Sequence, residues 1–131
     1  MKKLVFIFVL IYLLICVSCN KNNNIEIIKT NSNIIKQEYL AQMNEVGAYL
    51  LEDDEKAIIV IMGKLKNNYF SEVNLDDTDI ILNYTYESLD DSNILTCKDV
   101  YLINNIHRDS IIKLYHNEKE DCFVKVIACE L

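Results

Sequence analysis

The chain has 131 residues and a formal net charge of −7, with only two glycines and no proline. One domain is the expectation for this length. The scarcity of glycine and proline argues against glycine-rich phosphate loops and against collagen-like or proline-rich segments. The acidic balance argues against partners such as nucleic acid or anionic lipid head groups, because both carry negative charge.

The first residues have the pattern of a bacterial export signal. Two lysines follow Met1 and precede an unbroken apolar run over residues 4–17. At about 1.5 Å per residue this run spans roughly 21 Å, which is less than the ~30 Å hydrocarbon core of a membrane. Residues 1–18 are therefore predicted to be a cleaved signal peptide rather than a spanning helix.

The tetrapeptide Val17-Ser18-Cys19-Asn20 resembles the bacterial lipobox, in which a small residue precedes a cysteine that is lipidated and becomes the new N-terminus. The resemblance implies a lipid anchor on Cys19, and several acyl chains make such an anchor effectively permanent. Cys16 stands where this box usually has leucine. Two alternatives stay open: lipidation of Cys16, which bulky Leu14 and Ile15 disfavour, or a signal in which Cys19 is incidental.

Residues 19–24 continue as a polar stretch, which predicts a flexible stalk between the anchor and a domain over residues 25–131. Loss of Lys2 and Lys3 with the signal leaves 11 basic against 20 acidic residues, a net charge of −9. The predicted location is the cell envelope, with the chain tethered to a membrane. Asn20 is not the aspartate that retains some lipoproteins at the inner membrane, which favours the outer membrane where two membranes are present.

The rest of the chain is predicted to be an all-β, antiparallel sandwich. In residues 57–66, a period of two places Ala57, Ile59, Ile61 and Leu65 on one face. In residues 80–87, Ile80, Leu82, Tyr84 and Tyr86 alternate with polar residues. Further strands are expected at 95–103, 110–116 and 122–129, where Val124 and Val126 are assigned to the core, and a turn at 89–93. Residues 25–45 fit either a helical stripe or the beginning of a strand.

From residue 57 onward, this order of elements resembles the immunoglobulin-like FxLYD domains. Gly63, Leu65 and Asn67 match that family's Gly-x-Val-x-Asn pattern, and residues 82–87 take the place of its aromatic strand. The Leu-Tyr-Asp part is not reproduced, and residues 107–110 replace the Pro-Gly-Glu turn. The resemblance implies an immunoglobulin-like sandwich that serves as an interaction or spacer module in the bacterial envelope, with no catalytic residues.

Cys97, Cys122 and Cys129 remain outside the signal and anchor. Free cysteines that pack as small core hydrophobes are the first interpretation. An oxidising compartment also permits one disulfide, for which Cys97 and Cys122 are the slightly favoured pair. The pair is favoured because Cys122 lies on the same face of the predicted strand as the supposed core residues Val124 and Val126.

No cofactor motif is present. His107, His116 and these cysteines lack the close ligand pairs of a zinc site, so no metal is predicted.

Three acidic clusters, at residues 52–55, 76–79 and 90–91, are interpreted as solvated turns, because none follows the EF-hand spacing that calcium binding would favour. The eight tyrosines give a mild hint of recognition, because exposed tyrosine favours interfaces. Tyr69 and Phe70, placed in an acidic loop, are the candidate binding residues.

The sequence therefore predicts a membrane-anchored, non-catalytic binding or assembly module of the cell envelope with a protein partner. The alternative is an inhibitor or immunity lipoprotein that neutralises a basic toxin or enzyme, since a net charge of −9 would speed association with a basic target. An envelope enzyme and a structural lipoprotein without a defined ligand are weaker alternatives.

Overall fold

The computed structural model describes residues 24–64, 68–87 and 94–131 of the chain. The described parts form, in chain order, β1 (Glu26–Thr30), η1 (Ser32–Ile34, a 3-10 turn), α2 (Gln37–Leu40), β2 (Gly47–Glu52), β3 (Ala57–Lys64), β4 (Asn68–Asp76), β5 (Asp79–Glu87), β6 (Leu95–Asn104), β7 (Ile112–His116), β8 (Lys119–Asp121) and β9 (Lys125–Ala128). The predicted signal, the lipidation site Cys19 and the turn expected at 89–93 lie outside these residues.

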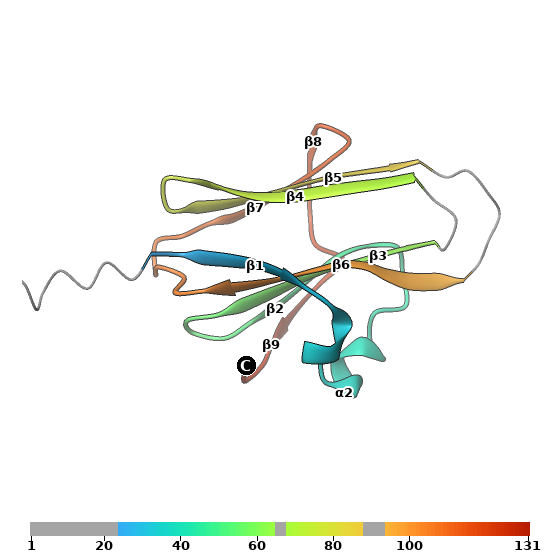
Figure 1. Cartoon of the computed structure of the whole chain (residues 1–131), viewed down its shortest axis with the longest axis horizontal. Coiled ribbons are helices and arrows are strands. Elements are labelled where there is room, and N and C mark those ends of the chain that lie inside the picture. The colour runs from blue at the N-terminus through green and yellow to red at the C-terminus, as the bar shows by residue number, and fades with distance from the viewer. Residues whose placement is uncertain (1–23, 65–67, 88–93) are drawn as a thin grey trace, which may run out of the picture.

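The strands form two stacked sheets, so the predicted all-β sandwich is confirmed (Figure 1). One sheet has the strand order β1-β6-β3-β2-β9, and the other has the order β4-β5-β7-β8. The sheets are mixed rather than purely antiparallel, because β9 runs parallel to β2 and β7 runs parallel to β5. The remaining pairs are antiparallel.

The inter-sheet core is built by strands whose apolar residues alternate. Ile80, Leu82 and Tyr84 of β5 point into it, as their spacing predicted. Ala57, Ile59 and Ile61 of β3 also belong to it, again as predicted. The other buried members are Ala48, Leu50, Tyr101, Ile103 and Leu114.

A second cluster, the outer core, covers the opposite face of the five-stranded sheet. Ile58 and Val60 of β3 belong to it, so this strand is buried on both faces. The segment between β1 and β2 lies over this face and contributes Ile35 and Met43 (Figure 1). Residues 25–45 thus form both candidate structures, since the strand β1 is followed by the short helices η1 and α2. The other buried members are Tyr49, Leu51, Val100 and Ile127.

Tyr49 fixes the end of the covering segment. Its side chain is 1% exposed, and its hydroxyl accepts a hydrogen bond from the Glu45 backbone N–H and donates one to the Glu45 carbonyl, each 3.0 Å long. The backbone N–H and carbonyl of Glu45 are therefore both satisfied by one buried side chain. These two bonds hold the chain against the sheet as it enters β2.

The expected terminal strand at residues 122–129 is shorter, and its predicted core residues are wrong. Val124 and Val126 are 41% and 52% exposed, whereas Ile127 is buried. The reason is that β9 is an edge strand in which Ile127 lies opposite Leu51, whose side chain belongs to the outer core. Val124 precedes the strand and lies against Gly47, where its Cγ2 atom would be only 2.5 Å from an added Cβ.

Candidate functional site

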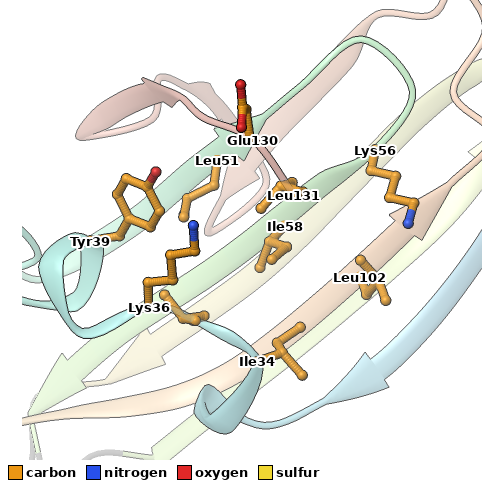
Figure 2. Close-up of a pocket in the computed structure, with 10 residues that line it drawn as sticks. Ile34, Lys36, Tyr39, Leu51, Lys56, Ile58, Leu102, Glu130 and Leu131 are labelled. Atoms are coloured by element: carbon orange, nitrogen blue, oxygen red, sulfur yellow. The ribbon is translucent and has the colours of Figure 1, made fainter.

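A groove of about 230 Å³ lies on the outer face of the five-stranded sheet (Figure 2). Its apolar floor comes from three strands, with Leu51 on β2, Ile58 on β3 and Leu102 on β6. One wall is the stretch from Ile34 to Tyr39, and the other is formed by Glu130 and Leu131. The groove therefore lies where the covering segment and the last residues flank an apolar sheet face without closing over it.

Local hydrogen bonds hold both walls in place. The Asn31 side chain accepts a bond from the Asn33 backbone N–H, 3.0 Å long, and so caps η1. On the other side, the Cys129 N–H donates to the Glu52 carbonyl at 2.9 Å, and the Leu131 N–H donates to Asp53 Oδ2 at 3.1 Å. The groove is therefore preformed rather than assembled from loose ends.

Two lysines flank the apolar floor. Lys36 and Lys56 extend from opposite sides of Ile58 (Figure 2), and both side chains are exposed. Within the described residues neither ammonium group forms an ion pair. These two cations stand at an apolar surface of a protein whose net charge is negative, so they are the groups of the groove available to an anion.

An acidic pocket of about 440 Å³ adjoins the groove and shares Lys56, Glu130 and Leu131 with it. Its other lining residues are Asp53, Asp54 and Glu55, from the turn between β2 and β3. Four carboxylates and one lysine give this pocket a formal charge of −3. The site as a whole therefore presents the Lys36 ammonium group, an apolar floor and an acidic end.

Asp53 organises the acidic pocket. Its Oδ1 atom accepts backbone hydrogen bonds from Glu55 and Lys56, each 2.9 Å long. These bonds favour the ionised form and lower the pKa of Asp53 below its ordinary value of 3.8. The turn is thus held together by a carboxylate that remains charged at neutral pH.

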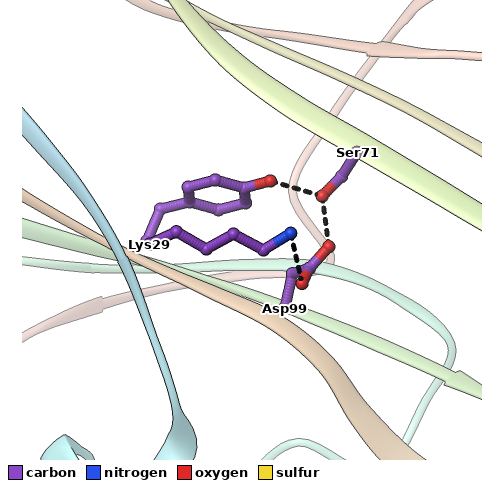
Figure 3. Close-up of polar contacts among 4 residues, drawn as sticks. Lys29, Ser71 and Asp99 are labelled. Carbon is purple, nitrogen blue, oxygen red and sulfur yellow. Dashed lines mark hydrogen bonds and ion pairs between the residues drawn. The ribbon is translucent and has the colours of Figure 1, made fainter.

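A separate polar cluster links the two sheets (Figure 3). Ser71 of β4 donates to Asp99 Oδ2 at 2.5 Å and lies 2.6 Å from the Tyr101 hydroxyl, both on β6. Because the single hydroxyl proton of Ser71 goes to Asp99, Tyr101 must be the donor in the second bond. Lys29 of β1 pairs with Asp99 Oδ1 at 3.2 Å, and this contact raises the pKa of Lys29.

This cluster holds the sheets together rather than presenting a reactive group. A nucleophilic serine needs a base to take its proton, yet Asp99 is also ion-paired with Lys29. Ser71 is 9% exposed, and none of the four residues lines the groove or the acidic pocket. Burial raises the pKa of Tyr101, so its hydroxyl stays protonated and can donate to Ser71.

The predicted binding residues Tyr69 and Phe70 do not form a common site. Both lie on β4 rather than in a loop, so they point to opposite faces of the sheet. Tyr69 packs against the inter-sheet core, and burial raises the pKa of its hydroxyl. Phe70 is 57% exposed, and neither residue lines the groove. The expectation of an exposed contact is therefore wrong for Tyr69.

The possible disulfide between Cys97 and Cys122 is absent, so the alternative of free thiols applies to both residues. Cys97 packs against the outer core, whereas Cys122 is exposed after β8, and both are free thiols, as is Cys129. The choice of Cys122 as the possible partner was wrong because it assumed that Cys122 faces the core in one continuous strand. Burial raises the pKa values of Cys97 and Cys129, which favours the protonated thiols.

His116 packs against aromatic rings. Its ring stacks on Tyr84 at 4.4 Å between centroids, and Nδ1 lies 3.7 Å from a carboxylate oxygen of Asp121. His107 is exposed. Across residues 24–64, 68–87 and 94–131, no three side chains of His, Cys, Asp or Glu are grouped so as to hold a metal ion. In the same ranges, no helix has the length and apolar character needed to cross a membrane.

A scan of family models, a search of curated proteins and a search of solved structures find no match to this chain. The resemblances to the lipobox and to the FxLYD domains therefore stay predictions.

Sequence reasoning missed the groove because its residues come from five separate parts of the chain. One signal was available in β3, where consecutive apolar residues at 57–62 exceed what one buried face requires. Such a run indicates that something covers the second face, and the groove lies where that cover is incomplete.

Proposed function

We propose that this protein is a lipid-anchored, non-catalytic binding module of the cell envelope, which engages a protein partner through the groove on its five-stranded sheet. The observation that carries the proposal is the preformed apolar floor of Leu51, Ile58 and Leu102, flanked by two lysines that form no ion pair within the described part of the chain. Interfaces gain most of their binding energy where an apolar anchor fills such a pocket and is surrounded by polar groups.

The N-terminal pattern supports the membrane-anchored part of the proposal. A basic start, a short apolar run and Ser18-Cys19 are the features of a lipoprotein signal. The polar residues after Cys19 would separate the anchor from β1, which begins at Glu26. An interaction role also agrees with what the resemblance to the FxLYD domains implies.

The acidic pocket beside the groove favours a second candidate, an inhibitor or immunity lipoprotein that neutralises a basic toxin or enzyme. Its formal charge of −3 would attract a basic target and orient it during the encounter. Deletion of the gene should then sensitise cells to a related competitor that delivers such a toxin. Unchanged sensitivity across related competitors would argue against this candidate.

The first experiment is site-specific photocrosslinking in cells. A photoreactive amino acid at Ile34, which is 42% exposed at the groove, should capture one partner identifiable by mass spectrometry. The matched control carries it at Thr85, exposed on β5 of the other sheet. A second control combines the Ile34 probe with Cys19→Ala to remove the anchor. Equal capture from both faces, or no capture from Ile34, would contradict the proposed binding surface.

A further inference from the structure

The volume of the groove limits what it can hold. An engineered apolar cavity of about 150 Å³ accepts benzene, whereas pockets for whole small molecules are about 300–1,000 Å³. A groove of about 230 Å³ therefore has room for one bulky apolar side chain. Its open form suits a residue presented by a partner segment that lies across the sheet.

The charges around the groove are unequal at its two ends. Lys36 stands beside Tyr39 on the covering segment and has no ion-pair partner among the described residues (Figure 2). At the other end, Lys56 belongs to the acidic pocket, where Asp53, Asp54, Glu55 and Glu130 outnumber it. A carboxylate is therefore favoured near Lys36, and a cation is favoured in the acidic pocket.

We infer that the groove recognises a protein segment in which one bulky apolar side chain stands between an acidic and a basic residue. The apolar side chain fills the floor over Ile58, the carboxylate contacts Lys36, and the basic group enters the acidic pocket. This inference rests on the proposed function and adds the chemistry of the partner. It also fixes which flanking residue of the segment lies at each end of the groove.

The direct test is methyl NMR of the full chain in lipid nanodiscs, using isoleucine methyl groups as reporters. Ile34 and Ile58 report on the groove, and Ile81 on β5 of the other sheet is the control. Three capped peptides share one central leucine and differ only in its flanking charges: one Glu and one Lys, two Glu, or two Lys. The mixed peptide should shift only the groove methyls and bind about three times more tightly than either like-charged peptide.

Charge-removing variants test the two ends separately. Lys36→Gln and Asp54→Asn alter exposed side chains, so the fold should be retained. Lys36→Gln should weaken binding of the mixed and two-Glu peptides by about threefold. It should not weaken binding of the two-Lys peptide, because it removes the cation that faces one of that peptide's lysines. Asp54→Asn should weaken the mixed and two-Lys peptides similarly. Lys119→Gln, at an exposed position on β8, is the matched control.

The outcomes separate the inference from the function on which it rests. Equal affinity for all three peptides, with shifts at Ile34 and Ile58, would overturn the charge order and retain the groove as a binding surface. No shift at either groove methyl with any peptide would overturn both the inference and the groove as the proposed binding surface. Shifts centred on Ile81 would place binding on the other sheet and would also overturn the inference.

Discussion

The Ser71 hydroxyl of the polar cluster contacts both Asp99 and Tyr101. Ser71→Ala removes both contacts and leaves two largely buried oxygen atoms without that partner. The expected loss is about 1–3 kcal/mol in the free energy of unfolding. The chain has eight tyrosines and no tryptophan, so urea unfolding can be followed by tyrosine fluorescence.

The matched control for Ser71 is Thr85→Ala, which shortens an exposed side chain on neighbouring β5. It should change the stability by less than about 0.5 kcal/mol. If Ser71→Ala proved as harmless as Thr85→Ala, the bond between the sheets would contribute nothing to stability. Loss of the Lys29–Asp99 ion pair alone should lower the unfolding free energy by less than Ser71→Ala does, because the Lys29 side chain is 59% exposed.

Asp53 gives stability a defined dependence on pH. Its folded-state pKa is lowered by backbone hydrogen bonds from Glu55 and Lys56, so the folded state favours the carboxylate. The stabilisation is fully present above the ordinary pKa of 3.8 and is lost as pH falls through the lower folded pKa. Asp53→Asn should therefore lose less stability on acidification below about pH 4 than the parent chain.

The comparison needs unfolding free energies of both chains across the acidic range. At neutral pH, Asp53→Asn should already be less stable by about 1 kcal/mol, because an amide offers one acceptor oxygen where the carboxylate offers two. Asp54→Asn is the control, since Asp54 is exposed in the same turn. Parallel stability curves for Asp53→Asn and the parent would show that Asp53 is not the titrating group.

At the scale of elements, the hairpin between β7 and β8 contains a conformational conflict. Its two turn residues, Asn117 and Glu118, have φ angles of 49° and 67°. Asparagine tolerates this left-handed region, whereas the same conformation destabilises glutamate by about 1–2 kcal/mol. Glu118→Gly should therefore raise the unfolding free energy by about 1 kcal/mol, measured by urea titration.

Glu120→Gly is the opposite control for this hairpin, because Glu120 lies in β8 and glycine weakens a strand. Both substitutions remove a glutamate side chain, at positions two residues apart. The change in charge alone therefore predicts equal changes in the unfolding free energy. Backbone conformation predicts effects of opposite sign. A destabilising Glu118→Gly would mean that the glutamate side chain makes a contribution that outweighs the strain of its backbone.

The elements also show what a sequence can and cannot reveal. β5 was predictable because one of its faces meets the inter-sheet core and the other is more open, which leaves an alternating pattern. β9 was misassigned because an edge strand of four residues carries little periodic signal, and exposed Val126 looks like a core residue. The parallel pairings of β7 and β9 depend on contacts between distant segments, so no local pattern records them.

The candidate site was less predictable than the fold. Tyr69 and Phe70 were chosen because aromatic side chains near acidic residues suggest an exposed loop, yet a strand separates them onto two faces. The groove instead uses residues such as Ile34, Ile58 and Leu131, which are unremarkable in the sequence. Their joint role arises only when the covering segment and the last residues meet on one sheet face.

At the scale of the whole molecule, residues 19–24 would limit where a partner can be if they form the proposed stalk. Residues 19–24 span at most about 20 Å when fully extended, at roughly 3.3–3.6 Å per residue. A domain on such a stalk stays close to the membrane. A partner that reaches the groove would therefore be another membrane-associated protein or one that comes within this distance of the surface.

The anchor itself gives the last prediction. The intact chain should partition with membranes and carry the added mass of its acyl chains, whereas Cys19→Ala should lack that mass and lose membrane retention. Cys16→Ala should retain the acyl mass, because bulky Leu14 and Ile15 make Cys16 the poorer site. Mass spectrometry and membrane fractionation of the three chains measure both effects. Acyl mass that persists in Cys19→Ala but is lost in Cys16→Ala would move the anchor to Cys16, and an unmodified parent chain would refute lipidation altogether.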